Sequence, residues 1–231
     1  MARPVTVAGV IPWIQLDTAT VPEGGALRLM QRGGEYAIML DRLELMNSRR
    51  GGSEEALASL ACEKLRDRKS ARVLIGGLGM GFTLRAALAA LGPQARVTVA
   101  EIVPAIVAWG RGPLASLYGN ALTDGRVTIE ETDVSRLIRG AKAAYEAILL
   151  DVDNGPDGLS RKANDALYDS AGLAATRAAL KPGGVLAVWS AGPDRKFSER
   201  LRRGGFAVEE KTAHAHGTRG PRHVIWLATK P

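Results

Sequence analysis

The sequence is poor in the residues that cross-link a protein or anchor it in a membrane. Its single cysteine, Cys62, excludes an internal disulfide. No apolar run approaches the ~20 residues needed to cross a bilayer. The first apolar stretch is interrupted by Pro12 and carries no cleavage pattern. These absences predict a cytoplasmic protein that is neither secreted nor embedded in a membrane.

Histidine is scarce as well. The three histidines, His214, His216 and His223, share a Gly- and Arg-rich segment. Neither cysteine nor carboxylate stands beside them at ligand spacing, so we expect no metal site.

Positive charge is in excess, with a net charge of +7 over 231 residues. Such an excess can indicate an anionic partner such as nucleic acid. The densest basic stretch, Arg195 to Arg222, alternates with Glu199, Glu209 and Glu210. This mixture favours a solvated basic face over a nucleic-acid groove.

The pattern changes near residue 50. Before it, short β-like segments are separated by turn residues, which predicts a small β-rich extension over residues 1–50. The segments are Val5–Val10, Ala26–Gln31, Tyr36–Leu40 and Leu43–Met46. After it, helices and strands alternate over residues 51–231. We expect a first helix capped by Ser53 and ending near Arg66.

Seven strands are predicted in this second part, several of them continuous apolar runs typical of strands covered on both faces. They are Arg72–Ile75, Arg96–Ile102, Arg126–Glu131, Ala147–Asp153, Val185–Ser190, Phe206–Lys211 and His223–Thr229. Helices such as Phe82–Leu91 and Arg161–Leu180 lie between the first five. This alternation predicts an α/β fold with a doubly wound, mostly parallel sheet that ends in an antiparallel pair.

The sharpest motif is a glycine-rich turn between a buried strand and a helix. It contains Gly76, Gly77, Gly79 and Gly81. Glycines allow a tight turn and the close approach of a ligand, and the helix N-terminus supplies free N–H groups. The dinucleotide pattern fails because its third glycine position is Phe82. The turn fits instead the looser glycine pattern of proteins that bind S-adenosylmethionine, a ligand without a pyrophosphate. A turn with a purely structural role is the alternative.

Two acids follow at the ends of the next strands. Glu101 lies 20 residues beyond Gly81, where a carboxylate can accept hydrogen bonds from both ribose hydroxyls. Asp133 is placed either to meet an adenine edge or to cap the following helix. An exposed strand-end charge is the plainer interpretation of Glu101.

The predicted catalytic residues are Asp151 and Asp153, in the segment YEAILLDVDNGPDG. They end the fourth strand, at the sheet edge where open α/β folds bind ligands. Because strand side chains alternate, both point the same way and one can raise the pKa of the other. Either would accept a proton from a nucleophile. Trp189, near the end of the fifth strand, is a candidate wall of the substrate pocket, and a structural carboxylate is the alternative role for the acids.

Taken in order, five segments resemble the spermidine synthase-like branch of the class I S-adenosylmethionine-dependent methyltransferase superfamily. They are VLIGGLGMGFTLRAAL, VAEIVPAIVAW, ETD at 131–133, YEAILLDVDNGP and ALKPGGVLAVWS. The resemblance implies a Rossmann-like class I methyltransferase fold, a nucleoside pocket at the glycine turn, Glu101 and Asp133, and a catalytic acid at Asp151. It also implies a homodimer.

Departures from this family decide the expected reaction. Spermidine synthases usually carry an Asp where this chain has Gly79 and a second Asp where it has Asn154. Because these acids would hold a cationic polyamine, we expect methyl transfer from S-adenosylmethionine to a small-molecule acceptor. Aminopropyl transfer from decarboxylated S-adenosylmethionine is the alternative. A non-catalytic module that binds a nucleoside or RNA is a further one.

Overall fold

The computed structural model describes residues 11–21, 24–152, 166–216 and 219–231. The chain divides into two compact units, Met1–Arg49 and Arg50–Pro231. None of the helices in the described ranges is long and apolar enough to cross a membrane.

The first unit contains a four-stranded antiparallel sheet in the order β1-β2-β3-β4. The strands are β1 (Ile14–Thr20), β2 (Ala26–Arg32), β3 (Glu35–Leu40) and β4 (Leu43–Asn47). Leu29 and Ile38, which are paired across β2 and β3, are fully buried. The sequence predicted three of these strands but not β1, and the strand expected at Val5–Val10 lies outside the described residues.

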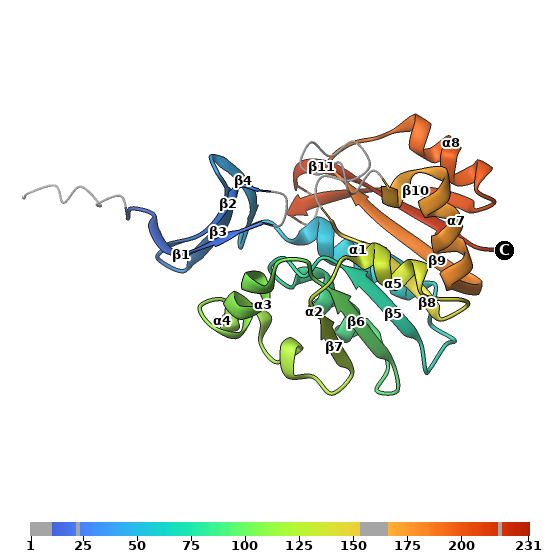
Figure 1. Ribbon diagram of the computed structural model, residues 1–231, viewed down its shortest axis with the longest axis horizontal. Helices are drawn as coiled ribbons and strands as arrows, with labels where there is room; N and C mark the ends of the chain where they lie inside the picture. The colour runs from blue at the N-terminus through green and yellow to red at the C-terminus, as the bar shows by residue number, and fades with distance from the viewer. Residues whose placement is uncertain (1–10, 22–23, 153–165, 217–218) are drawn as a thin grey trace, which may run out of the picture. The chain divides into compact units, whose positions relative to one another are not determined.

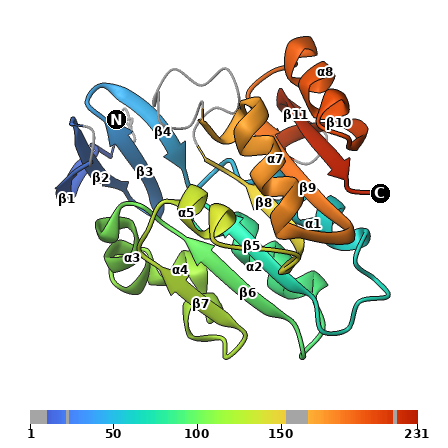
Figure 2. The same ribbon diagram turned by 45° about the vertical axis from the view of Figure 1, so that its right-hand side comes forward.

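The second unit is built on a seven-stranded sheet in the order β10-β11-β9-β8-β5-β6-β7. Five strands are parallel, and β11 pairs antiparallel with both β9 and β10. Figure 2 shows β8, β5, β6 and β7 side by side. The doubly wound, mostly parallel sheet expected from the sequence is therefore confirmed. The bounds are β5 (Arg72–Gly76), β6 (Arg96–Ala100), β7 (Val127–Glu130), β8 (Tyr145–Leu150), β9 (Leu180–Ser190), β10 (Ala207–His216) and β11 (Arg219–Thr229).

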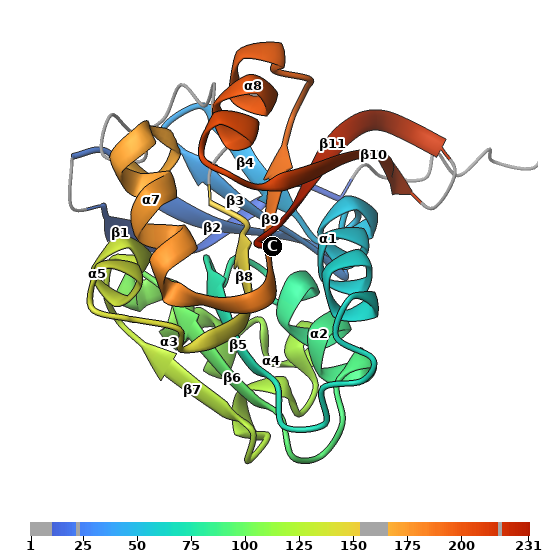
Figure 3. The same cartoon turned by 90° about the vertical axis from the view of Figure 1, so that its right-hand side faces the viewer.

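Helices cover both faces of this sheet. Figures 1 and 3 show α1 (Gly52–Glu63) and α2 (Phe82–Ala90) on one face, with α5 (Val134–Arg139) and α7 (Ser170–Ala179) on the other. The remaining helical segments are α3 (Pro104–Arg111), α4 (Ala115–Tyr118), η1 (Ala121–Thr123) and α8 (Arg195–Arg203). The crossover from β7 to β8 reverses the strand order next to β5. Open α/β sheets bind ligands at such a reversal.

The core on the α5 and α7 face joins strand side chains to aromatic ones. Ile148 and Leu150 of β8 pack there with Leu186 and Val188 of β9. The ring of Phe197 in α8 lies edge-on to Trp226 of β11, with 5.0 Å between ring centroids. Since alternate residues of a strand face opposite sides, the intervening residues of β8 and β9 face α1 and α2.

Two helices differ from their predicted bounds. Ser53 does not cap α1, because the helix already begins at Gly52 and the Ser53 hydroxyl donates to Glu54 Oε2 instead (2.6 Å). The same helix ends at Glu63 rather than near Arg66. Of the single helix expected over 161–180, residues 161–165 lie outside the described residues. The rest is interrupted at Asp169, whose side chain accepts from Gly172 N (2.7 Å) at the start of α7.

Candidate functional site

The glycine turn joins β5 to α2 at the strand-order reversal. Gly77, Gly79 and Gly81 have φ values of +90°, +51° and +81°, a region that only glycine enters without strain. A Cβ at Gly77 would overlap the carbonyl oxygen of Asp151. Gly77 N also donates to Ala100 O (2.9 Å), so the turn is fixed to β6. Gly76 is the last residue of β5.

Glu101 is a buried acid directly after β6. Its Oε2 accepts from Leu78 N in the glycine turn (3.0 Å), and its Oε1 accepts from Val103 N (2.8 Å). The alternative interpretation of Glu101, an exposed charge at the end of a strand, is therefore wrong. Because each carboxylate oxygen has two lone pairs, both can still accept a hydroxyl hydrogen. Glu101 therefore holds the turn in place, and its role toward a ribose stays a prediction.

Tyr118 closes the turn from α4. Its hydroxyl donates to Gly79 O, and its buried ring stands where a Cβ of Gly81 would lie, 2.6 Å away. Burial and the nearby charge of Glu101 raise the pKa of Tyr118. The phenol therefore stays protonated and serves as a fixed donor.

Asp133 caps α5. Its Oδ1 accepts from Ser135 N (2.7 Å), which satisfies a free N–H of the first turn. Of the two expected roles, the helix cap is present. Contact with an adenine remains a prediction.

Asp151 follows β8 and faces α2. Thr83 Oγ1 donates to Asp151 Oδ2 (2.5 Å), and Asp151 N continues the ladder to Gly76 O (3.0 Å). Burial, and after it the negative charge of Glu54, raise the pKa of Asp151 to about 7, although the Thr83 hydrogen bond acts to lower it. A carboxyl group that titrates near neutrality is suited to accept a proton.

Glu54 is a candidate site residue that no sequence pattern indicates. It lies in the first turn of α1, and Thr83 Oγ1 contacts its carbonyl oxygen (3.3 Å). Burial raises the pKa of Glu54 above its ordinary value, although the Ser53 hydrogen bond opposes this. Nothing local in the sequence reveals that its partner lies 97 residues away, at Asp151.

The expected partner of Asp151 was Asp153, which lies outside the described residues. Within the part of the chain that the structure describes, the second acid at Asp151 is Glu54. No Lys or Arg forms an ion pair with either acid among those residues, and no three His, Cys, Asp or Glu side chains gather as metal ligands.

The electrostatics of this edge select among ligands. Glu101 contacts the glycine turn, and Asp151 and Glu54 lie at Thr83 in the first turn of the helix that follows it. Their negative charge would repel a phosphate and attract a cation. The arrangement fits a nucleoside that carries positive charge rather than a pyrophosphate.

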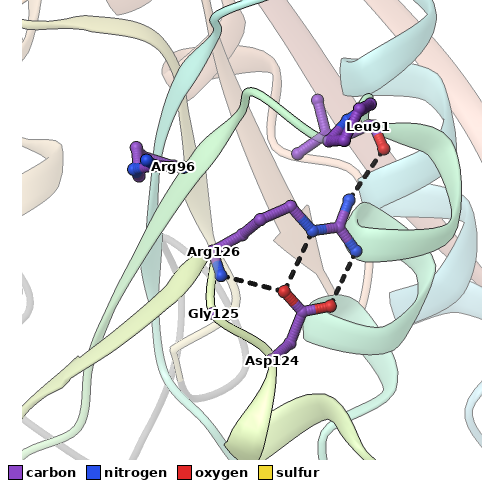
Figure 4. Close-up of a pocket in the computed structure, with 6 residues that line it drawn as sticks. Leu91, Arg96, Asp124, Gly125 and Arg126 are labelled. Atoms are coloured by element: carbon purple, nitrogen blue, oxygen red, sulfur yellow. Dashed lines mark hydrogen bonds and ion pairs between the residues drawn. The ribbon is translucent and has the colours of Figure 1, made fainter.

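A hollow of about 500 Å³ lies elsewhere, at the amino ends of β6 and β7. Figure 4 shows Arg126 in it, with its guanidinium paired to Asp124 (2.8 Å) and bonded to Leu91 O. The hydrogen bonds to Arg126 hold the pKa of Asp124 at about 2. This hollow contains none of the predicted site residues.

Comparison with known proteins identifies the fold. No protein-family model matches the chain, and no curated protein matches it in sequence. Spermidine synthase from Thermotoga maritima has a similar structure, with a TM-score of 0.76 at 17% identity, covering 94% of this chain and 73% of that one. A spermidine synthase in complex with the transition state analogue AdoDATO gives a TM-score of 0.74 at 18% identity, covering 94% and 72%.

A probable spermidine synthase from Corynebacterium glutamicum gives a TM-score of 0.61 at 17% identity, covering 97% of this chain and 81% of that one. The chain therefore has a spermidine synthase-like fold of the class I methyltransferase type.

Proposed function

We propose that the protein is a transferase that binds decarboxylated S-adenosylmethionine at the glycine turn and transfers its aminopropyl group to a small-molecule amine. The observation that carries this proposal is that Thr83, beside the turn, contacts both Asp151 and the backbone of Glu54, and that burial and the negative charge of Glu54 raise the pKa of Asp151. Asp151 and Glu54 are called the acid pair below. A similar structure was obtained with AdoDATO, which agrees with a ligand of this class.

With Glu54 beside Asp151, the reason for preferring methyl transfer no longer holds. That preference rested on acids missing from the sequence at Gly79 and Asn154. Glu54 supplies a second carboxylate from α1, so a cationic amine has acids to bind to. The similar structures are spermidine synthases as well, and they favour the aminopropyl alternative over methyl transfer.

The sulfonium compound supplies an activated carbon next to a positively charged sulfur. Toward it, the chain provides a rigid turn, Glu101 as an acceptor for sugar hydroxyls, and carboxylates that stabilise positive charge. Asp151 accepts the proton that the amine nitrogen loses as its N–C bond forms and the C–S bond breaks. Alignment of amine and carbon provides most of the acceleration.

Calorimetric titration with decarboxylated S-adenosylmethionine and S-adenosylmethionine, run side by side, tests the proposal. We expect tighter binding of the decarboxylated compound, and release of 5′-methylthioadenosine when an amine is added. Preference for the carboxylated compound would restore methyl transfer. Binding without turnover over a broad set of amines would indicate a non-catalytic nucleoside-binding module. If neither compound binds, the proposal is wrong.

A further inference from the structure

An aromatic pair stands on β9 and β11, outside the acid pair. The Trp189 indole and the His223 imidazole are stacked, with 4.8 Å between ring centroids and 30° between planes. Trp189 is the next-to-last residue of β9, and it pairs with Ile225 of β11. Both side chains are half-buried.

Sheet register places this pair beside Asp151. Leu150 of β8 pairs with Val188 of β9 in parallel, so Asp151 and Trp189 are the next residues on the two strands. Leu150 and Val188 face the α7 side, and the following residues therefore face α1 and α2. Since neighbouring strands are about 4.8 Å apart, the indole and the carboxylate occupy adjacent positions on one face.

Two polar atoms of the pair are buried without a hydrogen-bond partner among the described residues, Trp189 Nε1 and His223 Nδ1. Leaving such a group unpaired is unfavourable, because it loses its hydrogen bonds to water and gains none in the protein. Trp226, on the opposite face of β11, shows the usual arrangement, because its Nε1 donates to Ser198 Oγ (2.9 Å). The unpaired atoms at Trp189 and His223 thus mark a place where a ligand can supply the partner.

The chemistry of the two rings restricts that ligand. An indole N–H only donates, so its partner must be an acceptor oxygen or nitrogen. Burial and the neighbouring His214 lower the pKa of His223, which keeps the imidazole neutral near pH 7. The far ammonium group of a diamine would therefore find no acceptor on the indole, whereas an anionic oxygen can accept from the indole N–H and from an imidazole N–H.

We propose that Trp189 and His223 bind the far end of the acceptor, and that this end carries a carboxylate or a similar anionic oxygen. The acceptor is then an amino acid-like amine, with its ammonium at Asp151 and Glu54 and its oxygens at the aromatic pair. This inference rests on the proposed transferase function and narrows its substrate.

A matched pair of amines tests it. 4-Aminobutanoate and 1,4-diaminobutane have the same length and differ only at one end. Each is titrated into the full chain with and without 5′-methylthioadenosine, while the indole N–H signals are followed by NMR. We expect 4-aminobutanoate to bind more tightly and to shift the Trp189 signal, which W189F identifies by its disappearance.

W189F should weaken 4-aminobutanoate about tenfold, the usual effect of losing a hydrogen bond to a charged group. Nucleoside affinity should not change. W226F is the matched control, since it removes an indole from the other face and should lower only thermal stability. H223N provides a second variant of the pair if W189F unfolds.

The outcomes separate the two proposals. Tighter binding of 1,4-diaminobutane, an unmoved Trp189 signal, or failure of both amines overturns the aromatic subsite and leaves the transferase proposal standing. If neither 5′-methylthioadenosine nor decarboxylated S-adenosylmethionine binds, the transferase proposal fails. The titration without nucleoside then still decides whether the pair binds a carboxylate.

Discussion

Thr83 donates its hydroxyl hydrogen to Asp151 over 2.5 Å and contacts the carbonyl oxygen of Glu54 over 3.3 Å. One hydroxyl from α2 thus links the end of β8 to the first turn of α1. Because this bond favours the charged carboxylate, it limits the rise in the pKa of Asp151.

Replacing Thr83 with valine should move the acidic limb of the activity profile to higher pH, because the bond that lowers the pKa of Asp151 is lost. It should also cost about 1–2 kcal/mol of stability. The pH dependence of kcat/KM reports the first effect. T83S keeps the hydroxyl and should restore the profile; an unchanged limb in T83V would contradict the assignment.

Glu54→Gln should shift the same limb in the opposite direction, to lower pH. Removing the negative charge lowers the pKa of Asp151, because that charge contributes to its rise. Amine affinity should fall as well, since one of two acids is lost. Glu55→Gln is the matched control, because Glu55 is exposed and pairs with Arg85. Equal effects of both variants would remove Glu54 from the site.

Asp151→Asn should abolish most turnover but stabilise the protein at alkaline pH. The folded state holds the proton more tightly than the unfolded chain, whose ordinary pKa is near 3.8. Stability is therefore lost as pH rises from about 4 to about 7. Above this window the variant should be more stable by about 1–2 kcal/mol, a value reduced for partial exposure.

Urea unfolding at pH 5 and pH 8 measures this difference, which should grow with pH. The exposed residue Asp67 supplies a control, since D67N should show no such growth. A difference that is constant with pH would mean that Asp151 is ionised throughout the range.

Gly77→Ala should destabilise the protein by more than about 2 kcal/mol. A positive φ costs a side chain about 1–2 kcal/mol, and the new Cβ would overlap the carbonyl oxygen of Asp151. Thermal unfolding and nucleoside affinity should both suffer. Gly125→Ala is the matched control, because a Cβ there meets nothing within 4 Å. Similar Tm values for the two variants would show that the turn does not require glycine at position 77.

Glu101→Gln should weaken nucleoside binding and lower stability by about 1–3 kcal/mol. Both carboxylate oxygens now accept a hydrogen bond from a backbone N–H, and in the variant an amide NH₂ would face one of these donors. Calorimetry and thermal unfolding measure the two effects. Glu130→Gln on β7 changes an exposed acid and should alter neither. Retained nucleoside affinity in E101Q would restrict Glu101 to a structural role.

The sheet and the turn could be predicted because their signals are local. Continuous apolar runs mark the buried strands, and Gly77 and Gly81 are required by backbone conformations of the turn itself. By contrast, β1 was missed because its side chains are almost all exposed and show no alternation.

The candidate site was only partly predictable, because some of its residues have a local signal in the sequence and others do not. Glu101, Asp133 and Asp151 each end or follow a strand, a position that the sequence reveals. Glu54 reaches Asp151 only through tertiary packing of α1 against the sheet, which no local pattern encodes. The homodimer expected from the resemblance stays a prediction, which sedimentation would test.

The strand order also bears on how the protein folds. β11 comes after β10 in the sequence, yet it lies between β10 and β9. Until β11 is in place, the apolar strand β9 is an open edge beside the nascent site, with unpaired N–H and C=O groups. The Trp189–His223 stack can form only once β11 has paired with β9, so the aromatic pair reports whether this edge of the sheet has closed correctly.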